Sequence, residues 1–145
     1  LSVNPGQNLK SLIHIASGGE LSRTMLALKT ILQTHDPSTV MIFDEVDTGI
    51  SGRVAEMVGQ KLRNLGQKQQ TLCVTHLPQI AAFSDSHYVV EKQIEKDATY
   101  TVVRKTSTSE EKAQEIAQLI GGREITEKTF SVAYEMLEQA RSAAG

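Results

Sequence analysis

The sequence predicts an α/β fold with a parallel strand–helix–strand core, flanking helices and an antiparallel hairpin. Two short apolar runs, 40–43 and 71–75, are separated by a stretch whose apolar residues recur at helical spacing. This order indicates two parallel strands joined by a right-handed crossover. Two further β-rich runs, 87–94 and 99–105, flank a short polar connection, and they predict a hairpin at the edge of the sheet.

The composition is typical of one soluble globular domain. The chain has 145 residues, of which 39% are hydrophobic and 22% charged, enough for one packed core and unlike a disordered protein. The net charge of −2 and the absence of Trp argue against a strongly basic nucleic-acid surface or a base-stacking platform. Because neither a membrane-length apolar run nor a signal peptide is visible, we expect a cytoplasmic protein. Its abrupt ends suggest a fragment of a longer protein.

The first helix is predicted to follow Ser17 and to run to about residue 32, after a loop at 1–16. Ser17 and Glu20 have the N-cap and N3 spacing of a capping box. Pro37 ends the helical stretch, since the residue before a proline avoids helical geometry. One apolar face recurs at i, i+4, i+7 and i+11, and its members are Leu21, Met25, Leu28 and Leu32.

The first strand runs from four apolar residues, 40–43, straight into Asp44 and Glu45. Its β-branched composition predicts a strand buried on both faces within a parallel sheet. Ligands collect beyond the carboxyl ends of such strands. Because successive residues point to opposite faces, one carboxylate could hold a metal while the other handles a proton. The alternative is a strand that ends in a solvated acidic turn, and this run alone favours that alternative.

The second helix and second strand follow a turn-rich loop. The second strand, 71–75, should also be buried, and it contains the single Cys73, which cannot form an internal disulfide. His76 falls at the carboxyl end of this strand, and a short helix is predicted over 78–83. The second helix should end near Gly66, with an inward side formed by Val54, Met57, Val58, Leu62 and Leu65.

Two helices are predicted after the hairpin. The first begins at Glu110 and Glu111, whose charges suit the helix dipole, and stops at 121–122. The last covers about 127–142, and the sequence leaves open whether it packs on the core or faces another part of the protein. The expected apolar positions are Ala113, Ile116, Ala117 and Ile120 on the first helix and Phe130, Ala133, Tyr134 and Leu137 on the last.

Three features in this order suit nucleoside triphosphate hydrolysis, which needs positioning and charge stabilisation. The helix start at Gly18 and Gly19 offers bare N–H groups and a positive dipole end to a phosphate. Asp44 could hold Mg²⁺ through water, and Glu45 could polarise the attacking water. His76 could hydrogen-bond the terminal phosphate.

Each feature also has a purely structural interpretation. The segment 17–20 could be only a capped helix start. A single histidine is usually structural, and we interpret His14, His35 and His87 in this way. His76 differs because it ends the strand that follows the acidic pair. The three features together are therefore far more specific than any one of them.

These residues resemble the ATP-binding-cassette ATPases. Residues 16–20 resemble their signature motif, 40–45 resemble the Walker B strand with its catalytic glutamate, Asp47 falls in the D-loop, and His76 matches the switch histidine. Glu20 in the signature resembles the SMC-like chromosome-maintenance branch, not the transporters. The amino-acid sequence resembles, over nearly the whole chain, a bacterial DNA-repair member of that branch.

The resemblance implies a mechanism in which two ATPase heads close on each other with ATP between them. The signature residues would face the γ-phosphate of the partner's ATP, and Asp47 would lie across the dimer seam. Ser17 would either cap its helix or bind that phosphate. The implied site consists of catalytic Glu45 and His76, metal-binding Asp44, and nucleotide-binding Ser17, Gly18, Gly19, Glu20 and Asp47.

One departure from the family pattern is the lack of a G-x-x-x-x-G-K-[ST] phosphate loop. A sustained heptad pattern is also missing. The resemblance places that loop in an N-terminal lobe beyond a long coiled coil. We therefore expect residues 1–145 to be the C-terminal lobe of an ABC/SMC-type head, inactive alone. The expected partners are the N-terminal lobe of the same protein, a second copy through ATP-bridged heads, and DNA double-strand ends.

Three alternatives fit the sequence less well. The head of another SMC-like ATPase fits less well, because the loop at 48–52 resembles the DNA-repair member more closely. A transporter subunit usually has glutamine at the end of its signature. A dimerisation module without turnover would need neither Glu45 nor His76.

Overall fold

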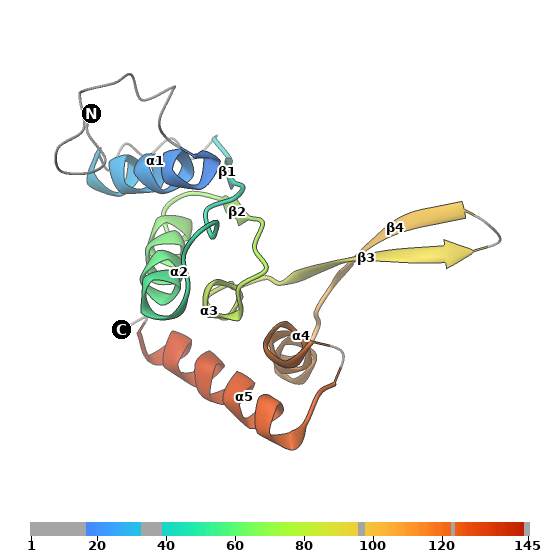
Figure 1. The fold of residues 1–145 in the computed structure, drawn as a ribbon. Coiled ribbons are helices and arrows are strands. Elements are labelled where there is room, and N and C mark those ends of the chain that lie inside the picture. Colours follow the sequence, from blue (N-terminus) through green and yellow to red (C-terminus); the bar gives the residue numbers. More distant parts are fainter. Residues whose placement is uncertain (1–16, 33–38, 96–97, 123, 144–145) are drawn as a thin grey trace, which may run out of the picture.

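The computed structural model describes residues 17–32, 39–95, 98–122 and 124–143, so the predicted loop at 1–16 lies outside the described residues. Helices alternate with two small sheets (Figure 1), which confirms the predicted mixed α/β class with a parallel pair and a hairpin. The elements are α1 (Gly18–Leu32), β1 (Met41–Phe43), α2 (Gly52–Gly66), β2 (Thr71–Cys73), α3 (Pro78–Ala81), β3 (Tyr88–Glu95), β4 (Ala98–Lys105), α4 (Ser109–Gly121) and α5 (Glu127–Ser142).

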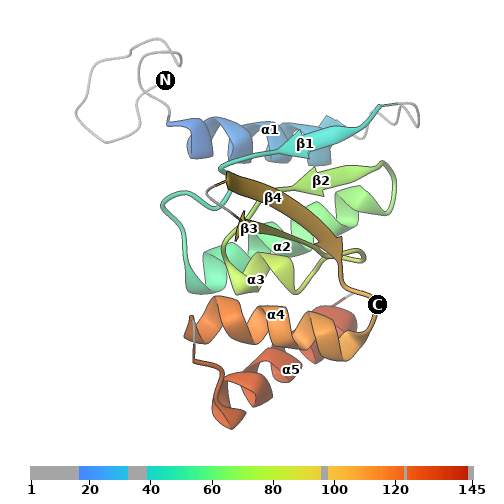
Figure 2. The same ribbon diagram turned by 90° about the vertical axis from the view of Figure 1, so that its right-hand side faces the viewer.

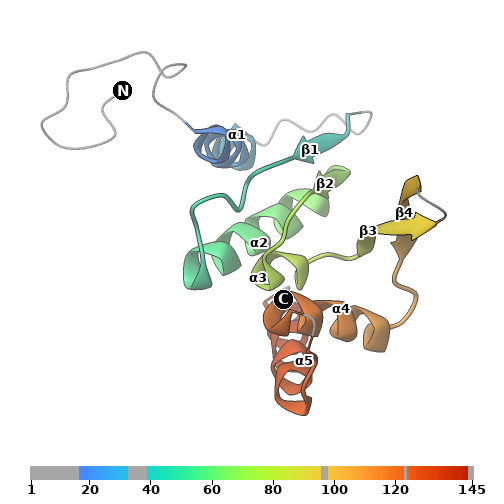
Figure 3. The same ribbon diagram turned by 45° about the vertical axis from the view of Figure 1, so that its right-hand side comes forward.

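The core that positions the acidic residues is the unit β1–α2–β2. The two strands are parallel, with Met41 opposite Thr71 and Phe43 opposite Cys73, and α2 lies along one side of the pair (Figure 3). The side chain of Phe43 is buried against this side. The apolar cluster there comprises Leu26, Phe43, Val46, Ala55, Leu62, Leu65 and Ile80.

The prediction that both strands are buried on both faces is wrong for the outer face. Ile42, Leu72 and Val74 remain exposed, Ile42 to 72%. Their neighbours Phe43 and Cys73 point to the other face, as alternation along a strand requires. Within the described part of the chain nothing covers the outer face of this pair, which is why its apolar residues remain open. Cys73 itself is half-buried.

The first helix is correctly predicted, but its buried side is not the predicted one. Leu26 and Gly19 are the buried residues of α1, and Leu26 packs with Phe43. The helix is apolar around much of its circumference, so periodicity alone could not identify the face that meets the core. The predicted face, Leu21, Met25, Leu28 and Leu32, is exposed.

The inward side of α2 also departs from the prediction. Leu62 and Leu65 are buried as predicted, whereas Val54 and Met57 are exposed. Small residues take their place, because α3 approaches α2 closely: a Cβ on Gly59 would lie 2.6 Å from the ring of Phe83. A contact made by glycine and alanine carries no hydrophobic signal in the sequence.

The C-terminal helices form a second apolar cluster with α3, in which α4 and α5 lie side by side (Figure 2). Ile116 of α4 is completely buried. The N-cap of this helix is Thr108, whose side chain accepts from Glu111 N at 3.1 Å. Gly122, with φ 69°, ends α4 as predicted. The packing of α5 on α4 answers the question that the sequence left open.

The hairpin is present but does not extend the parallel sheet. Tyr88 pairs with Lys105 at its base, and β3 and β4 form a separate two-stranded sheet that projects from the body (Figure 1). Arg104 of β4 ties the hairpin to the body through Glu115 of α4, and within the hairpin its guanidinium contacts Glu91 at 3.2 Å. The alternating sequence pattern identified the two strands, but it did not show whether they pair with the parallel strands.

Candidate functional site

The loop after β1 carries the two candidate carboxylates. The chain turns at Glu45, which has φ 56°, a left-handed conformation that is uncommon for residues other than glycine. The turn is closed by Thr48 N, which donates to Glu45 O at 3.0 Å. Asp44 and Glu45 are both exposed. Strained backbone of this kind is often found at functional sites.

Two side chains of α1 hold this loop in place. Ser22 Oγ donates to Asp44 O at 2.8 Å. Arg23 Nη1 donates to Val46 O at 3.1 Å and to Thr48 O at 2.7 Å. The sequence analysis missed both anchors, because a serine and an arginine on an exposed helix give no signal that they bind a distant backbone.

The glycine-rich start of α1 lies against the same loop. The predicted capping box is present, with Glu20 N donating to Ser17 Oγ at 3.3 Å and Ser17 N to Glu20 Oε2 at 3.0 Å. A Cβ on Gly19 would lie 2.8 Å from Glu45 O, and one on Gly18 would overlap the Glu45 carboxylate. Only glycine allows the helix start to approach the acidic loop this closely.

Replacing Gly19 by alanine is therefore expected to destabilise the chain by about 1–3 kcal/mol, because the backbone of the acidic loop must move. Gly66→Ala is the matched control, since a Cβ there meets nothing within 4 Å. Urea unfolding of both variants measures the difference. An equal midpoint for Gly19→Ala and the wild-type chain would contradict the close approach.

Asp47 and His76 join the ends of the two parallel strands. The Asp47 side chain is 5% exposed, and its Oδ2 accepts from Thr75 Oγ at 2.7 Å and from His76 N at 2.9 Å. The His76 Nδ1 atom lies 2.9 Å from the same oxygen. Burial alone would raise the pKa of Asp47, but the bonds from Thr75 and His76 and the charge of His76 outweigh it and lower the pKa.

The predicted site residues thus lie around one end of the β1–β2 pair. Gly18 and Gly19 contact the Glu45 region, and Asp47 connects that loop to His76. Thr75, which the sequence analysis did not select, belongs to this group. The placement of Asp47 at a dimer seam stays a prediction, and here its carboxylate is engaged within its own chain. Among the described residues, no three acidic, histidine or cysteine side chains form a metal-binding group.

Comparisons with known proteins give close relatives over nearly the whole chain. DNA repair protein RecN of Halalkalibacterium halodurans is 49% identical over 142 residues, which cover 98% of this chain and 25% of that protein. RecN of Bacillus subtilis is 47% identical over 140 residues, covering 97% of this chain and 24% of the relative. This chain is homologous to RecN. It spans about a quarter of the length of the curated RecN proteins that it matches.

The other two comparisons add little to the RecN homology. No family model matches the chain. A solved structure from work on ATP-driven dimerization and DNA stimulated activation of SMC ATPases aligns with a TM-score of 0.48 and 23% identity. That alignment covers 82% of this chain and 70% of the other.

Cys73 of this RecN-related chain lies on β2, and its thiol should react slowly. Burial, with the nearby charges of Asp47 and Asp44, raises its pKa to about 12. At pH 8 we expect iodoacetamide to modify Cys73 at least about 100-fold more slowly in the folded chain than in the urea-unfolded chain, because only the thiolate reacts. Mass spectrometry of timed samples measures this ratio. Similar rates in the two states would contradict a raised pKa.

The same pKa shift sets a pH dependence of stability. The pKa of the Cys73 thiol in the folded chain lies above the unfolded value of 9.0. The contribution of this thiol to the free energy of unfolding is therefore full below pH 9 and is lost as the pH rises toward 12. Over that range the unfolded thiol ionises first. Comparing unfolding of the wild-type chain and Cys73→Ser at each pH isolates this contribution, which is absent from the serine variant.

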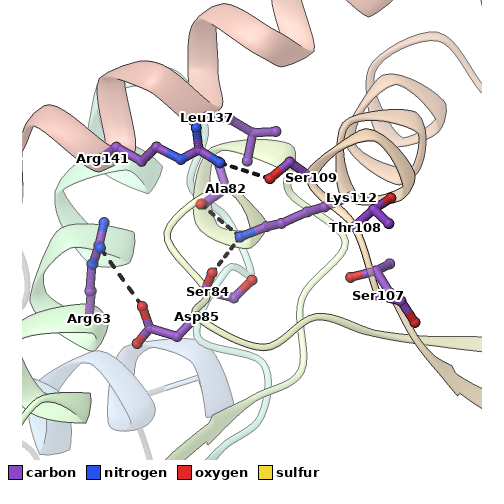
Figure 4. Close-up of a pocket in the computed structure, with 11 residues that line it drawn as sticks. Arg63, Ala82, Ser84, Asp85, Ser107, Thr108, Ser109, Lys112, Leu137 and Arg141 are labelled. Carbon is purple, nitrogen blue, oxygen red and sulfur yellow. Dashed lines mark hydrogen bonds and ion pairs between the residues drawn. The ribbon is translucent and has the colours of Figure 1, made fainter.

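A pocket of about 280 Å³ lies away from the acidic loop, among α2, α3, α4 and α5 (Figure 4). Lys112 Nζ donates there to the carbonyls of Ala82, at 3.2 Å, and Ser84, and burial lowers its pKa to about 8. Arg63 and Arg141 are likewise bonded to protein oxygens. These cations are engaged within the protein, where they tie α5 to α2, α5 to α4, and α4 to the segment that follows α3.

None of the helices in the described ranges is long and apolar enough to cross a membrane.

Proposed function

We propose that residues 1–145 form the C-terminal lobe of a split ATPase head in a RecN-type DNA repair protein. The parent protein would hydrolyse ATP to drive the closure of two heads, acting in the cytoplasm on DNA double-strand ends. The RecN homology over nearly the whole chain supports the biological setting. The residues around Glu45 support the chemistry.

The observation that carries the proposal is the junction of three motifs at one end of the β1–β2 pair. The glycine-rich helix start contacts the loop of Glu45, and Asp47 joins that loop to His76. Each motif alone has a structural explanation. An exposed acid in a left-handed turn, on the loop whose Asp47 contacts an exposed histidine, suits a site that handles a phosphate and a water.

Each residue has a defined task in this proposal. Asp44 would hold Mg²⁺ together with the ATP phosphates and water, a sparse ligand set that suits this ion. Mg²⁺ would neutralise charge on the phosphates. Glu45 would orient and deprotonate the attacking water, and His76 would hydrogen-bond the terminal phosphate.

Ser17, Gly18, Gly19 and Glu20 would bind the ATP held by the partner head. The first N–H groups of α1 and its dipole favour a phosphate there. Because Ser17 Oγ already accepts from Glu20 N, contact with the phosphate requires that cap to loosen when the heads close. Asp47 belongs to the same nucleotide-binding set in this proposal.

The N-terminal lobe would supply the phosphate loop that this sequence lacks. The outer face of the β1–β2 pair supports such a partner, because Ile42, Leu72 and Val74 are exposed apolar residues on a short sheet. Apolar residues of this kind are normally covered in parallel sheets. Alone, the chain should bind ATP poorly and hydrolyse hardly any.

The test is ATP turnover by the chain mixed with a separately expressed N-terminal lobe of the parent protein, against each lobe alone. Activity should appear only on mixing and should disappear when the chain carries Glu45→Gln. Multiple turnover by the purified chain alone would contradict the split-head proposal. If both lobes are folded and bind each other but stay inactive with ATP, Mg²⁺ and DNA, a dimerisation module without turnover becomes the better account.

A further inference from the structure

Asp47 makes contacts that a nucleotide ligand or a dimer contact would not require. Its side chain is almost completely buried, yet the ionic partner that the described residues give it is the ring of His76. One oxygen, Oδ2, accepts hydrogen bonds from Thr75 Oγ at 2.7 Å and from His76 N at 2.9 Å, and His76 Nδ1 also lies 2.9 Å from it. All three of these neighbours of the Asp47 carboxylate belong to its own chain.

The first two of these bonds have an ordinary structural role. Thr75 Oγ and the amide of His76 fasten the loop that follows β1 to the end of β2. Any acceptor at this position would do the same. The approach of the ring is different: Nδ1 lies 2.9 Å from Oδ2, and because a carboxylate only accepts, a proton between the two atoms must come from His76.

The contact between Nδ1 and Asp47 determines whether the other ring nitrogen, Nε2, can donate or accept a hydrogen bond. The His76 side chain is 75% exposed, so Nε2 faces outward while Nδ1 is held inside. With the ring neutral, Nε2 is an acceptor. With the ring protonated, Nε2–H is a donor aimed at an incoming anion, and a carboxylate behind a histidine orients the ring in other carboxylate–histidine pairs.

The loop that carries Asp47 is held from the other side as well. Arg23 of α1 donates to the carbonyls of Val46 and Thr48, the residues on either side of Asp47. The backbone of Asp47 is therefore fixed independently of His76.

We infer that Asp47 is a positioning residue that acts within its own chain: it fixes the imidazole of His76 with Nδ1 protonated and Nε2 facing outward toward a phosphate. The expected effect of Asp47 on ATP turnover rests on the proposed function. The orientation of the His76 ring does not depend on that function. Asp47 thereby links the loop of the candidate base Glu45 to the candidate phosphate sensor.

The orientation is tested on the chain itself by ¹⁵N NMR of the His76 ring, at a pH at which the imidazole is neutral. The wild-type ring should show the Nδ1–H tautomer. In Asp47→Ala it should move toward the Nε2–H form that free imidazole prefers. Thr75→Val, which removes a different donor to the same oxygen, should keep the Nδ1–H form.

An Nε2–H ring in the wild-type chain, or an unchanged tautomer in Asp47→Ala, would overturn the orientation. If Asp47→Ala does not fold, Asp47→Asn replaces it, since an amide oxygen can still accept from Nδ1. The asparagine variant should then keep the Nδ1–H tautomer, and its loss would overturn the role of the oxygen.

The catalytic part is tested by ATP turnover of the full-length parent protein. Asp47→Ala should lower kcat about 10- to 100-fold with little change in KM, the usual effect of losing an orienting partner. The double variant Asp47→Ala/His76→Ala should be no slower than His76→Ala alone, because Asp47 acts only through the His76 ring. Additive losses would overturn the inference. Normal turnover by His76→Ala would contradict the proposed function instead, while the NMR result still decides the orientation.

Discussion

Replacing Glu45 by glutamine in the parent protein is expected to slow ATP turnover by about 100- to 10,000-fold, the range for removal of a general base. Glutamine has the same shape, so the turn at φ 56° and the contact with Gly18 should persist. Nucleotide binding should therefore survive, and ATP-bridged heads should accumulate because they cannot open by hydrolysis. Turnover assays and the elution volume in ATP on a sizing column measure the two effects.

Glu56→Gln is the control for this prediction. Glu56 is also an exposed acid, on α2, and its loss changes the net charge by the same amount. It should leave turnover within about twofold of the wild type, as expected for a surface substitution. Equal rates for the two variants would exclude Glu45 as the base.

The second large effect concerns stability. Ile116→Ala is expected to lower the free energy of unfolding by about 2–5 kcal/mol, because it removes buried methyl groups and leaves a cavity. Ile116 is completely buried at the contact between α4 and its neighbours. A loss of this size is a large part of the stability of a small domain. The midpoint of urea unfolding, at unchanged slope, measures it.

Leu119→Ala is the matched control on the same helix. Its side chain is 38% exposed, so truncation removes less buried surface and leaves no closed cavity. It should cost about 1 kcal/mol or less. If both variants lost the same stability, the burial of Ile116 in this cluster would be wrong.

The sequence was sufficient for the order and type of the elements. The strand–helix–strand unit followed from two short apolar runs separated by a helical pattern, and the cap at Ser17 and Glu20 followed from spacing alone. The stop at Gly122 was equally readable, since glycine at a positive φ ends helices. These features depend on neighbouring residues, so local sequence determines them.

Features that depend on distant neighbours were not predictable. Leu26 and not Met25 faces the core, because α1 meets the sheet on a side that its broad apolar surface does not specify. Ile42 is exposed although its strand reads as buried. Asp47 looked like a loop acid available to other molecules, and its burial depends on Thr75 and His76, almost thirty residues away.

The two apolar clusters meet at α3, a helix of four residues. Ile80 belongs to the cluster under the parallel strands, and its neighbours 81–83 belong to the cluster of α4 and α5. The helix begins two residues after His76. Because packed interiors tolerate little distortion, a change that displaces α3 should disturb the packing under the parallel strands and the packing of the C-terminal helix pair at once.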